Sequence, residues 1–307
     1  MSTVTDRLGR DAVAEKGWLG AHKWLIARRI SQAFILALFL AGPVAGIWIL
    51  KGNLSSSRLL DWLPMTDPLL FLQFIFAGHF AIAQDAIIGA GLVVAFYLLV
   101  GGRLYCAWVC PVNIITDAAH WLRRRLKLKS SARIGRQTRV WMLAAVLAVA
   151  LVTGTAAYEL INPVLMFHRG LVFGMGLAWT LVLGIFLFDL LVMKHGWCGH
   201  LCPMGALYGI IGSASLVRVR ADARATCDDC MECYEVCPEP QVIPPALMGA
   251  RHGKPEAGAA ILSGACTNCA RCIDICPHDV FNFGWRFSAS QAGGRQPQNL
   301  ETAPDGL

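Results

Sequence analysis

The sequence contains few charged residues. Only 15% of its 307 residues are Asp, Glu, Lys or Arg, whereas a soluble domain usually carries about a quarter. Hydrophobic residues make up 56% and gather in long runs. This argues against an ordinary soluble enzyme and favours a membrane protein that carries a smaller soluble part.

The sequence also lacks three patterns, and each absence argues against one class of protein. No G-x-G-x-x-G motif opens a helix after a strand, so a nicotinamide or flavin enzyme of that type is not expected. No small-residue cleavage site follows the first apolar run. We therefore expect this run to be a transmembrane span and not a cleaved signal peptide. The net charge is +7, but the Lys and Arg residues flank the apolar runs instead of forming a basic stripe on a soluble domain. No nucleic-acid partner is therefore expected.

Apolar runs predict four transmembrane helices, over residues 30–50, 86–104, 140–158 and 172–193. The shorter run 69–83 contains Gly78 and His79 and suits a re-entrant or interfacial segment better than a fifth span. Lys and Arg are frequent before residue 30 and in the stretch 101–139, and scarce in the other two connections. This bias predicts that both termini and the middle loop are cytoplasmic, in a bacterial inner membrane.

The apolar part contains an internal repeat. "MTDPLLFLQFIFAGH", a span and "LYCAWVCP" match "LINPVLMFHRGLVFG", a span and "GWCGHLCP". Each half begins and ends in the cytoplasm, so we expect parallel repeats related by an axis along the membrane normal. That symmetry would bring the pair Cys106 and Cys110 to the same depth as the pair Cys198 and Cys202, facing it.

Eight of the twelve cysteines form two runs, "CDDCMECYEVCP" and "CTNCARCIDICP". Both read C-x2-C-x2-C-x3-C-P, the run that ligates [4Fe–4S] clusters, and in two-cluster ferredoxins the fourth Cys serves the other cluster. Zinc sites prefer ligands in pairs, and a cytoplasmic location disfavours disulfides. We therefore predict two clusters, one held by Cys227, Cys230, Cys233 and Cys276, the other by Cys266, Cys269, Cys272 and Cys237.

The other four cysteines form the two C-x3-C-P pairs next to the membrane. A Pro follows Cys110 and Cys202, which predicts that each of these cysteines caps a new helix, where the helix dipole should lower its thiol pKa. Three interpretations stay open: a metal site or third cluster, redox-active thiols, or small buried residues. The segment that follows Pro111 reads as an amphipathic helix on the inner leaflet.

The predicted architecture is an α-helical membrane protein with four transmembrane helices as two parallel repeats, plus a C-terminal α+β two-cluster ferredoxin domain. Its boundaries are a cytoplasmic N-terminal tail over 1–28, a four-helix membrane domain over 29–216, a ferredoxin domain over 217–290 and a flexible tail over 291–307. Between the two cysteine runs, residues 239–265 are expected to form a loop.

These motifs resemble the NapH family, the ferredoxin-type membrane proteins of periplasmic nitrate reductase systems. "KGNLSSS", "WLRRRLKL", "FLFDLLV" and "HGWCGHLCPMGALYG" are similar to that family as well. MauN of methylamine utilisation, NosR and the FixG/CcoG group share the C-x3-C-P membrane core. Spacing and length fit NapH best, and MauN is the relative most easily confused with it. The resemblance implies a quinol dehydrogenase component that passes electrons through a NapG-like periplasmic iron–sulfur protein and a c-type cytochrome to the periplasmic nitrate reductase. The alternatives are a redox assembly or regulatory protein and the equivalent protein of methylamine utilisation.

Quinol oxidation releases two protons and therefore needs an acceptor beside an apolar cleft. His79 and His168 occupy roughly equivalent places in the two repeats, near the outer face, and are candidates to bind quinol. Asp85 and Glu159 lie at nearby span ends.

Ionisable side chains inside a membrane are costly and are usually paired or functional. Asp189 lies in the inner half of the fourth predicted span, where it either pairs with Lys194 or a loop arginine or transfers protons. His195 and His200 flank the second cysteine pair and are candidates to tune it or to ligate a metal.

Overall fold

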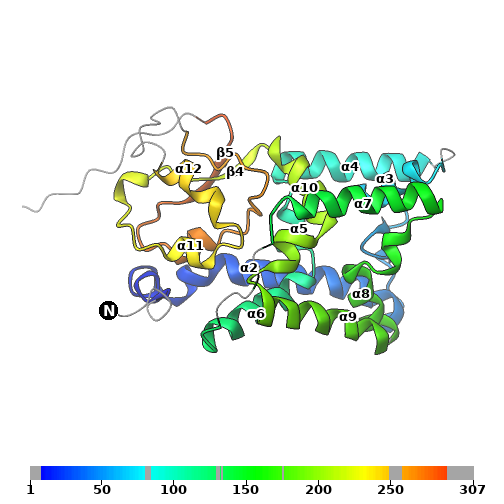
Figure 1. Cartoon of the computed structure of the whole chain (residues 1–307), viewed down its shortest axis with the longest axis horizontal. Coiled ribbons are helices and arrows are strands. Elements are labelled where there is room, and N and C mark those ends of the chain that lie inside the picture. The colour runs from blue at the N-terminus through cyan, green and yellow to red at the C-terminus, as the bar shows by residue number, and fades with distance from the viewer. Residues whose placement is uncertain are drawn as a thin grey trace, which may run out of the picture.

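The computed structural model describes residues 8–79, 84–128, 132, 134–174, 176–248 and 258–288. A bundle of helices that run in roughly the same direction forms one part, and a smaller lobe with short helices and two strands lies at its end (Figure 1). The lobe contains both cysteine runs, so the ferredoxin part is stacked on one end of the helix bundle.

Helix α2 (Arg10–Ala45) runs through both parts. Among the described residues it is the one helix long and apolar enough to cross a membrane. It begins twenty residues before the predicted span, so the stretch 10–28 expected as a tail is helical. The backbone leaves helical geometry at Gly17 (φ 73°), and Pro43 lies near the C-terminal end of the helix.

The N-terminal half of α2 is bound to the ferredoxin lobe by backbone groups. The Gly9 amide donates to Glu232 Oε2 (2.9 Å), and the amides of Trp24 and Leu25 donate to the Asp274 carboxylate (3.1 and 2.9 Å). Helix α2, on both sides of its break at Gly17, therefore joins the lobe to the bundle.

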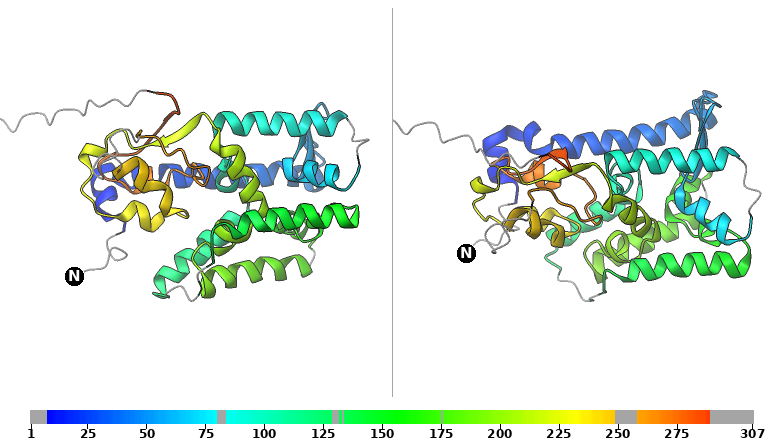
Figure 2. Two further views of the ribbon diagram at one scale, coloured as in Figure 1. Left: turned by 45° about the horizontal axis from the view of Figure 1, so that its top comes forward. Right: turned by 90° about the horizontal axis from the view of Figure 1, so that it is seen from above.

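The other predicted spans appear as shorter apolar helices: α4 (Gln84–Val100), α7 (Thr138–Thr153) and α9 (Gly176–Leu187), the last continued by a π turn, η2 (Phe188–Val192). The run 69–83 contains α3 (Pro68–Phe76), and residues 80–83 lie outside the described part. An additional helix, α8 (Pro163–Phe173), was not expected from the apolar runs. In Figure 2, α4, α7 and α9 extend away from the lobe as α2 does.

Helices α3 and α8 begin in the same way, as the repeated segments suggested. Asp67 caps α3 by accepting from the amides of Leu69 and Leu70, and Asn162 caps α8 by accepting from the amide of Val164 (3.1 Å). Each cap is followed by a Pro in the first turn. A side-chain acceptor followed by Pro is favourable here, because the first helical amides have no backbone partner.

A three-stranded antiparallel sheet takes up residues that the first predicted span and the connection after it were expected to use. Its strands are β1 (Leu50–Gly52), β2 (Ser56–Leu59) and β3 (Leu63–Thr66), in that order. Gly89 of α4 lets β3 pack closely, since a Cβ there would lie 2.9 Å from the Thr66 amide nitrogen.

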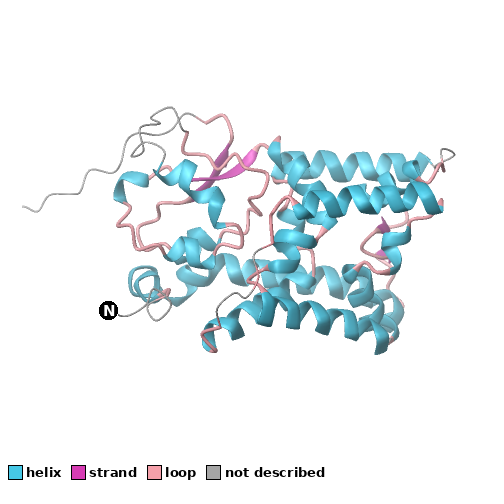
Figure 3. Ribbon diagram, in the orientation of Figure 1, coloured by secondary structure: helices cyan, strands magenta, loops and turns pink. Residues whose placement is uncertain are grey.

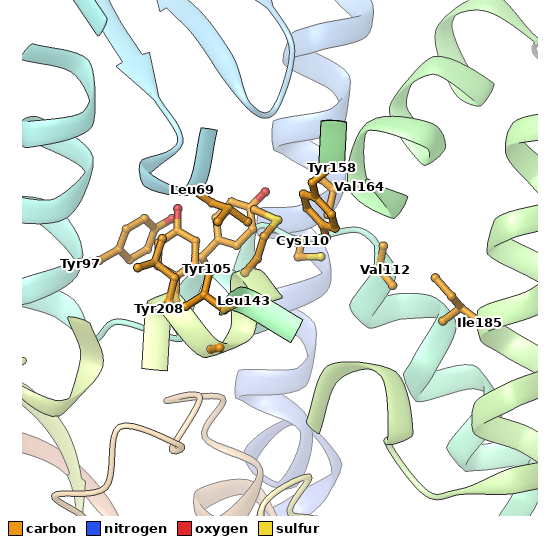
Figure 4. Close-up of a cluster of buried hydrophobic side chains, with 13 residues drawn as sticks. Leu69, Tyr97, Tyr105, Cys110, Val112, Leu143, Tyr158, Val164, Ile185 and Tyr208 are labelled. Atoms are coloured by element: carbon orange, nitrogen blue, oxygen red, sulfur yellow. The ribbon is translucent and has the colours of Figure 1, made fainter. Parts of the chain in front are cut away.

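Four short helices follow the C-x3-C-P pairs or contain them: α5 (Leu104–Trp108), α6 (Val112–Arg125), the π turn η3 (Trp197–Leu201) and α10 (Pro203–Ser213). They surround a core in which the Tyr105 and Tyr208 rings stack with centroids 5.0 Å apart. Figure 4 shows Cys110 in this core, close to Tyr158. The first cysteine pair is thus part of the packed junction between the helices.

The ferredoxin lobe pairs β4 (Val217–Arg220) with β5 (Asn282–Trp285) in antiparallel fashion, seen in magenta in Figure 3. Its other elements are η4 (Arg224–Thr226), α11 (Glu232–Val236), η5 (Pro240–Val242), α12 (Ile243–Met248) and α13 (Arg271–Ile275). The expectation of a loop is wrong for residues 240–248, which are helical because Ile243, Ala246 and Leu247 are buried in the core of the lobe.

Candidate iron–sulfur sites and their junction

The two ferredoxin runs share one backbone path. Asp229 and Asn268, each two residues after the first Cys of its run, have φ of 58° and 47°. Met231 and Ala270, each directly after the second Cys, have φ of 64° and 58°. Left-handed residues in alternation curl the chain, and Asp and Asn tolerate that conformation better than Met and Ala do. Each run therefore forms a loop that directs its first three thiols inward, ahead of α11 or α13.

The cysteines line two separate small cavities. One is lined by Cys227, Cys230, Cys233 and Cys276, and the other by Cys266, Cys269, Cys272 and Cys237. The fourth Cys of each run thus lies with the first three of the other run, as the crossed assignment predicts. The assignment of ligands to clusters remains a prediction.

The donor set fits polynuclear iron–sulfur centres. Among the described residues no three His, Cys, Asp or Glu side chains converge on a single metal ion, yet four thiols line each cavity. Apolar side chains such as Val219, Ile261 and Phe281 surround them. Soft thiolates in an apolar shell suit iron–sulfur clusters, which would supply one-electron transfer.

The structure brings the two C-x3-C-P pairs together. Cys110 lies within electrostatic reach of Cys106 and Cys202, and Cys198 within reach of the other three. Cys202 is the N-cap of α10, as predicted, but α6 is capped by Pro111 and not by Cys110.

The predicted lowering of the thiol pKa in these pairs is wrong. Burial raises the pKa of Cys110, and burial together with the nearby Cys106 raises the pKa of Cys202 to about 12. Loss of solvent around these thiols outweighs the helix dipole. Without an ion beside them the thiols are therefore protonated, which argues against free thiol chemistry and leaves the metal site and the small buried residues as interpretations.

Arg103 joins the C-x3-C-P thiols to the ferredoxin lobe, and the sequence patterns did not indicate it. Its Nη2 donates to the Cys198 carbonyl (2.9 Å), and its Nη1 donates to the Ala265 carbonyl (2.9 Å) and to Glu239 Oε1 (2.7 Å). Arg139 also donates to Glu239 (2.8 Å). Burial alone would raise the pKa of Glu239, but the adjacent Arg103 reverses this and lowers it, so the carboxylate is charged. The sequence did contain an indication of this role. Arg103 stands at the end of an apolar run, three residues before Cys106, and a charged side chain there needs a partner.

The two quinol candidates lie in different surroundings. His79 is exposed after α3 and donates from Nε2 to the Gly154 carbonyl (3.0 Å). His168 is buried inside α8, with its ring 5.2 Å from that of Phe39 and its Nε2 without a hydrogen-bond partner among the described residues. The expectation of equivalent places is therefore wrong, while a role for either in quinol binding remains a prediction.

The two acidic residues at the predicted span ends, Asp85 and Glu159, both have polar partners nearby. Asp85 forms an exposed ion pair with Arg58. Glu159 accepts from Ser55 Oγ (2.8 Å) and from Asn162 Nδ2 (3.3 Å). Both have structural partners that account for their positions.

Asp189 does not pair with Lys194. Its Oδ1 accepts from the Trp197 amide (2.9 Å), whereas Lys194 pairs with Glu235 (3.2 Å). Arg123, on α6, donates to the carbonyl oxygen of Asp189 (3.1 Å) and not to its carboxylate. Asp189 therefore ties the end of η2 to the start of η3, directly before the second cysteine pair.

His195 and His200 are both buried beside that pair. The His195 ring lies 4.6 Å from the ring of His120 on α6. His195 Nε2 and His200 Nδ1 have no hydrogen-bond partner among the described residues. Their role in tuning the pair remains a prediction.

Two protein families match the segments that contain the twelve cysteines. A family described as "4Fe-4S binding domain" matches residues 82–129 and 174–220, the two segments that carry the C-x3-C-P pairs. A family described as "4Fe-4S dicluster domain" matches residues 226–280. No solved structure matches the chain.

Several relatives are similar over most of their length. The methylamine utilization ferredoxin-type protein MauN of Paracoccus denitrificans is 52% identical over 82% of this chain and 87% of its own. The ferredoxin-type protein NapH is 51% identical in Escherichia coli, over 76% of this chain and 82% of its own, and 47% identical in Haemophilus influenzae, over 94% and 99%. The regulatory protein NosR of Pseudomonas aeruginosa is more distant, at 24% over 56% of this chain and 23% of its own. The resemblance to NapH is thereby confirmed, and the chain belongs to the NapH/MauN family of ferredoxin-type 4Fe-4S electron-transfer proteins.

Proposed function

We propose that the protein is a membrane-anchored subunit that takes electrons from quinol and passes them toward a periplasmic nitrate reductase. A NapG-like periplasmic iron–sulfur protein and a c-type cytochrome would carry the electrons onward. The single observation that carries the proposal is the placement of the cysteines. The lobe has two four-thiol cavities, and Glu239, which lines one of them, binds Arg103, which in turn binds the Cys198 carbonyl in a third group of four thiols.

The third group would hold a third [4Fe–4S] cluster. Both segments that supply it match a family described as "4Fe-4S binding domain". The guanidinium of Arg103 lies beside Cys106 and Cys198, where it would offset the negative charge of four thiolates bound to iron.

The membrane domain would consist of α2, α4, α7 and α9 with η2, as two parallel repeats with both termini in the cytoplasm. Large apolar side chains on these helices are exposed, among them Phe34, Phe96, Trp141 and Leu183. Contact with lipid would account for this exposure, because soluble proteins rarely leave large continuous apolar patches bare.

Reporter fusions test this topology. We expect alkaline phosphatase to be active when inserted after Asp61 or Leu160, and green fluorescent protein to fluoresce at the C-terminus. Active phosphatase at the C-terminus would contradict an even number of spans.

A second candidate role is the equivalent step in methylamine utilisation. The MauN of Paracoccus denitrificans is as similar to this chain as the NapH of Escherichia coli, at 52% and 51% identity. Co-purification separates the two roles: a nitrate reductase partner set supports the first, and methylamine-oxidising enzymes support the second.

The central experiment uses the full-length protein in detergent without oxygen. We expect about twelve irons and as many sulfides, four for each of three cubane clusters. Addition of a quinol should bleach the visible iron–sulfur absorbance. Zinc in place of iron would contradict the electron-transfer role. Full cluster content without bleaching would place quinol oxidation on a partner.

A further inference from the structure

A cavity of about 830 Å³ lies between α2, α6 and the ferredoxin lobe. Its walls combine apolar side chains, including Leu25, Ile114 and Trp121, with a set of charged ones. The charged lining residues are Arg10, Arg28, Arg29, Arg124, Arg271, Asp117 and Asp274. Neither His79 nor His168 lines it.

Two polar side chains of the cavity wall are buried without hydrogen-bond partners among the described residues. Arg28 is 1% exposed and His120 is 6% exposed. Neither ring nitrogen of His120 has a partner, and neither do Nε and Nη1 of Arg28, whose Nη1 lies 3.9 Å from Asp117 Oδ2, beyond hydrogen-bond distance. An unpaired donor or acceptor inside a protein is unfavourable, so these groups indicate a ligand that pairs with them.

The two carboxylates of the wall are already occupied. Asp117 accepts from Arg29 and from Arg271 (2.5 Å), and Asp274 accepts from the backbone of α2. The cavity therefore has free donors on Arg28 and one uncharged donor–acceptor in His120, since burial, then the adjacent His195, lowers the pKa of His120 to about 2.

The cavity adjoins both four-thiol cavities of the ferredoxin lobe. Arg271 lines it and also the cavity of Cys266, Cys269 and Cys272. Ile275 lines it and also the cavity on the other side of α13. A ligand that contacts Arg271 or Ile275 would therefore lie against a wall shared with one of the four-thiol cavities.

We propose that this cavity binds the headgroup of the quinol, with His120 accepting a hydrogen bond from one hydroxyl and Arg28 donating to an oxygen of the ring. This inference rests on the proposed function and gives it a site. Arg28 and Arg29 directly precede the first predicted span, so the headgroup would lie at the inner leaflet, with its isoprenoid tail leading past Ile114 toward the lipid.

The reaction at this site balances as one quinol giving one quinone, two protons and two electrons. The two electrons would pass to the clusters that the lobe cysteines hold, one to each. Both O–H bonds break toward water at the cavity mouth, and the neutral His120 imidazole holds one hydroxyl in place by accepting its hydrogen bond. The surplus of arginines stabilises the ring oxygen as negative charge develops on it. Both protons leave on the side of the ferredoxin lobe.

The test compares three full-length proteins in nanodiscs: wild type, His120→Phe and His168→Phe. The His120 change removes the acceptor and keeps a flat ring, and the His168 change is its match at the outer-face candidate. We expect the quinol-driven bleaching rate of His120→Phe to fall about tenfold, because the quinol hydroxyl loses the hydrogen bond that holds it in place. Dithionite should bleach all three equally, which shows that the clusters are intact. A quinol-driven rate that falls in His168→Phe and not in His120→Phe would overturn the inference.

A binding readout that does not depend on turnover or on a variant's folding is photolabelling of wild type with an azidoquinone. We expect the label on the α6 peptide around Trp121, and a label confined to α3 or α8 would overturn the inference. Equal quinol bleaching of wild type and His120→Phe would also overturn it. Wild type that dithionite reduces but quinol does not would instead refute the proposed function. An anionic lipid as the true occupant would show as bound phosphorus lost in Arg28→Met, with quinol kinetics unchanged, and would likewise overturn the inference.

Discussion

Arg103 donates from Nη1 to Glu239 Oε1 at 2.7 Å, with exposed side-chain fractions of only 2% and 1%. The two residues are 136 positions apart and join the end of α4 to the ferredoxin lobe. Arg136 and Arg139 bind the same carboxylate, so one buried negative charge organises three guanidinium groups. The docking of the lobe on the helices depends on this carboxylate.

Replacement of Glu239 by Gln should therefore destabilise the protein strongly. Removing one partner of a buried ion pair leaves an uncompensated charge, which costs about 3–5 kcal/mol. Thermal unfolding in detergent, followed by protein fluorescence, measures the loss. The matched control is Glu235→Gln, since Glu235 pairs with Lys194 at a half-exposed position and such pairs contribute about 0–1 kcal/mol. Equal shifts for the two variants would show that Glu239 does not hold the junction.

A second prediction concerns the contact between the α4–α5 turn and α10. A Cβ on Gly102 would lie 2.2 Å from the Gly212 amide nitrogen, so Gly102→Ala must force the backbones apart. Overpacking of this kind costs about 1–3 kcal/mol and should lower the melting temperature. Gly91 on α4 has nothing within 4 Å of its Cβ position, so Gly91→Ala should leave stability unchanged or raise it. An unchanged melting temperature for Gly102→Ala would refute the close packing.

The sequence predicted those features that depend on residues close together in the chain. The cysteine spacing indicated both ferredoxin runs. The two repeated segments also begin alike in the structure, where Asp67 and Asn162 cap α3 and α8. The apolar runs located α4, α7 and α9, although their ends shifted by several residues, since glycines such as Gly154 (φ 64°) end helices inside an apolar run.

Contacts between distant segments were not predicted. Asp117 and Arg271 are 154 positions apart, and no sequence motif around either residue predicts their ion pair. The same holds for Arg28 and His120, whose importance depends on what the fold leaves unpaired around them. The expected lowering of the thiol pKa failed for a related reason, because burial is a property of the whole fold.

The crossed ligation of the two clusters predicts a pattern of iron loss. Cys276→Ala and Cys227→Ala should each remove about four irons, and the double variant should lose no more, because both residues serve one cluster. Cys276→Ala combined with Cys266→Ala should lose about eight. The reverse pattern, with the larger loss for the first pair, would mean that each run ligates its own cluster.

The Asp117 cluster predicts a defined pH dependence. Burial alone would raise the pKa of Asp117, but Arg271, Arg29 and Arg28 together lower it. Its stabilising contribution is therefore fully present above the unfolded pKa of about 3.9 and is lost only as the pH falls through the lower folded value. The difference in melting temperature between wild type and Asp117→Asn should stay constant from about pH 8 to pH 5. A difference that shrinks between pH 7 and 5.5 would show that the arginines do not hold the carboxylate charged.

The C-x3-C-P thiols give the most decisive prediction. A double change of Cys106 and Cys198 to Ser keeps the side-chain size and removes one ligand from each pair. If the four thiols hold a cubane cluster, iron should fall from about twelve to about eight per protein, and the ferredoxin signals of the reduced protein should persist. Iron analysis with low-temperature electron paramagnetic resonance on both proteins measures this. Because burial keeps these thiols protonated in the absence of an ion, unchanged iron would leave them as packing residues of the core around Tyr105 and Tyr208, and the electron path would then begin at the ferredoxin lobe.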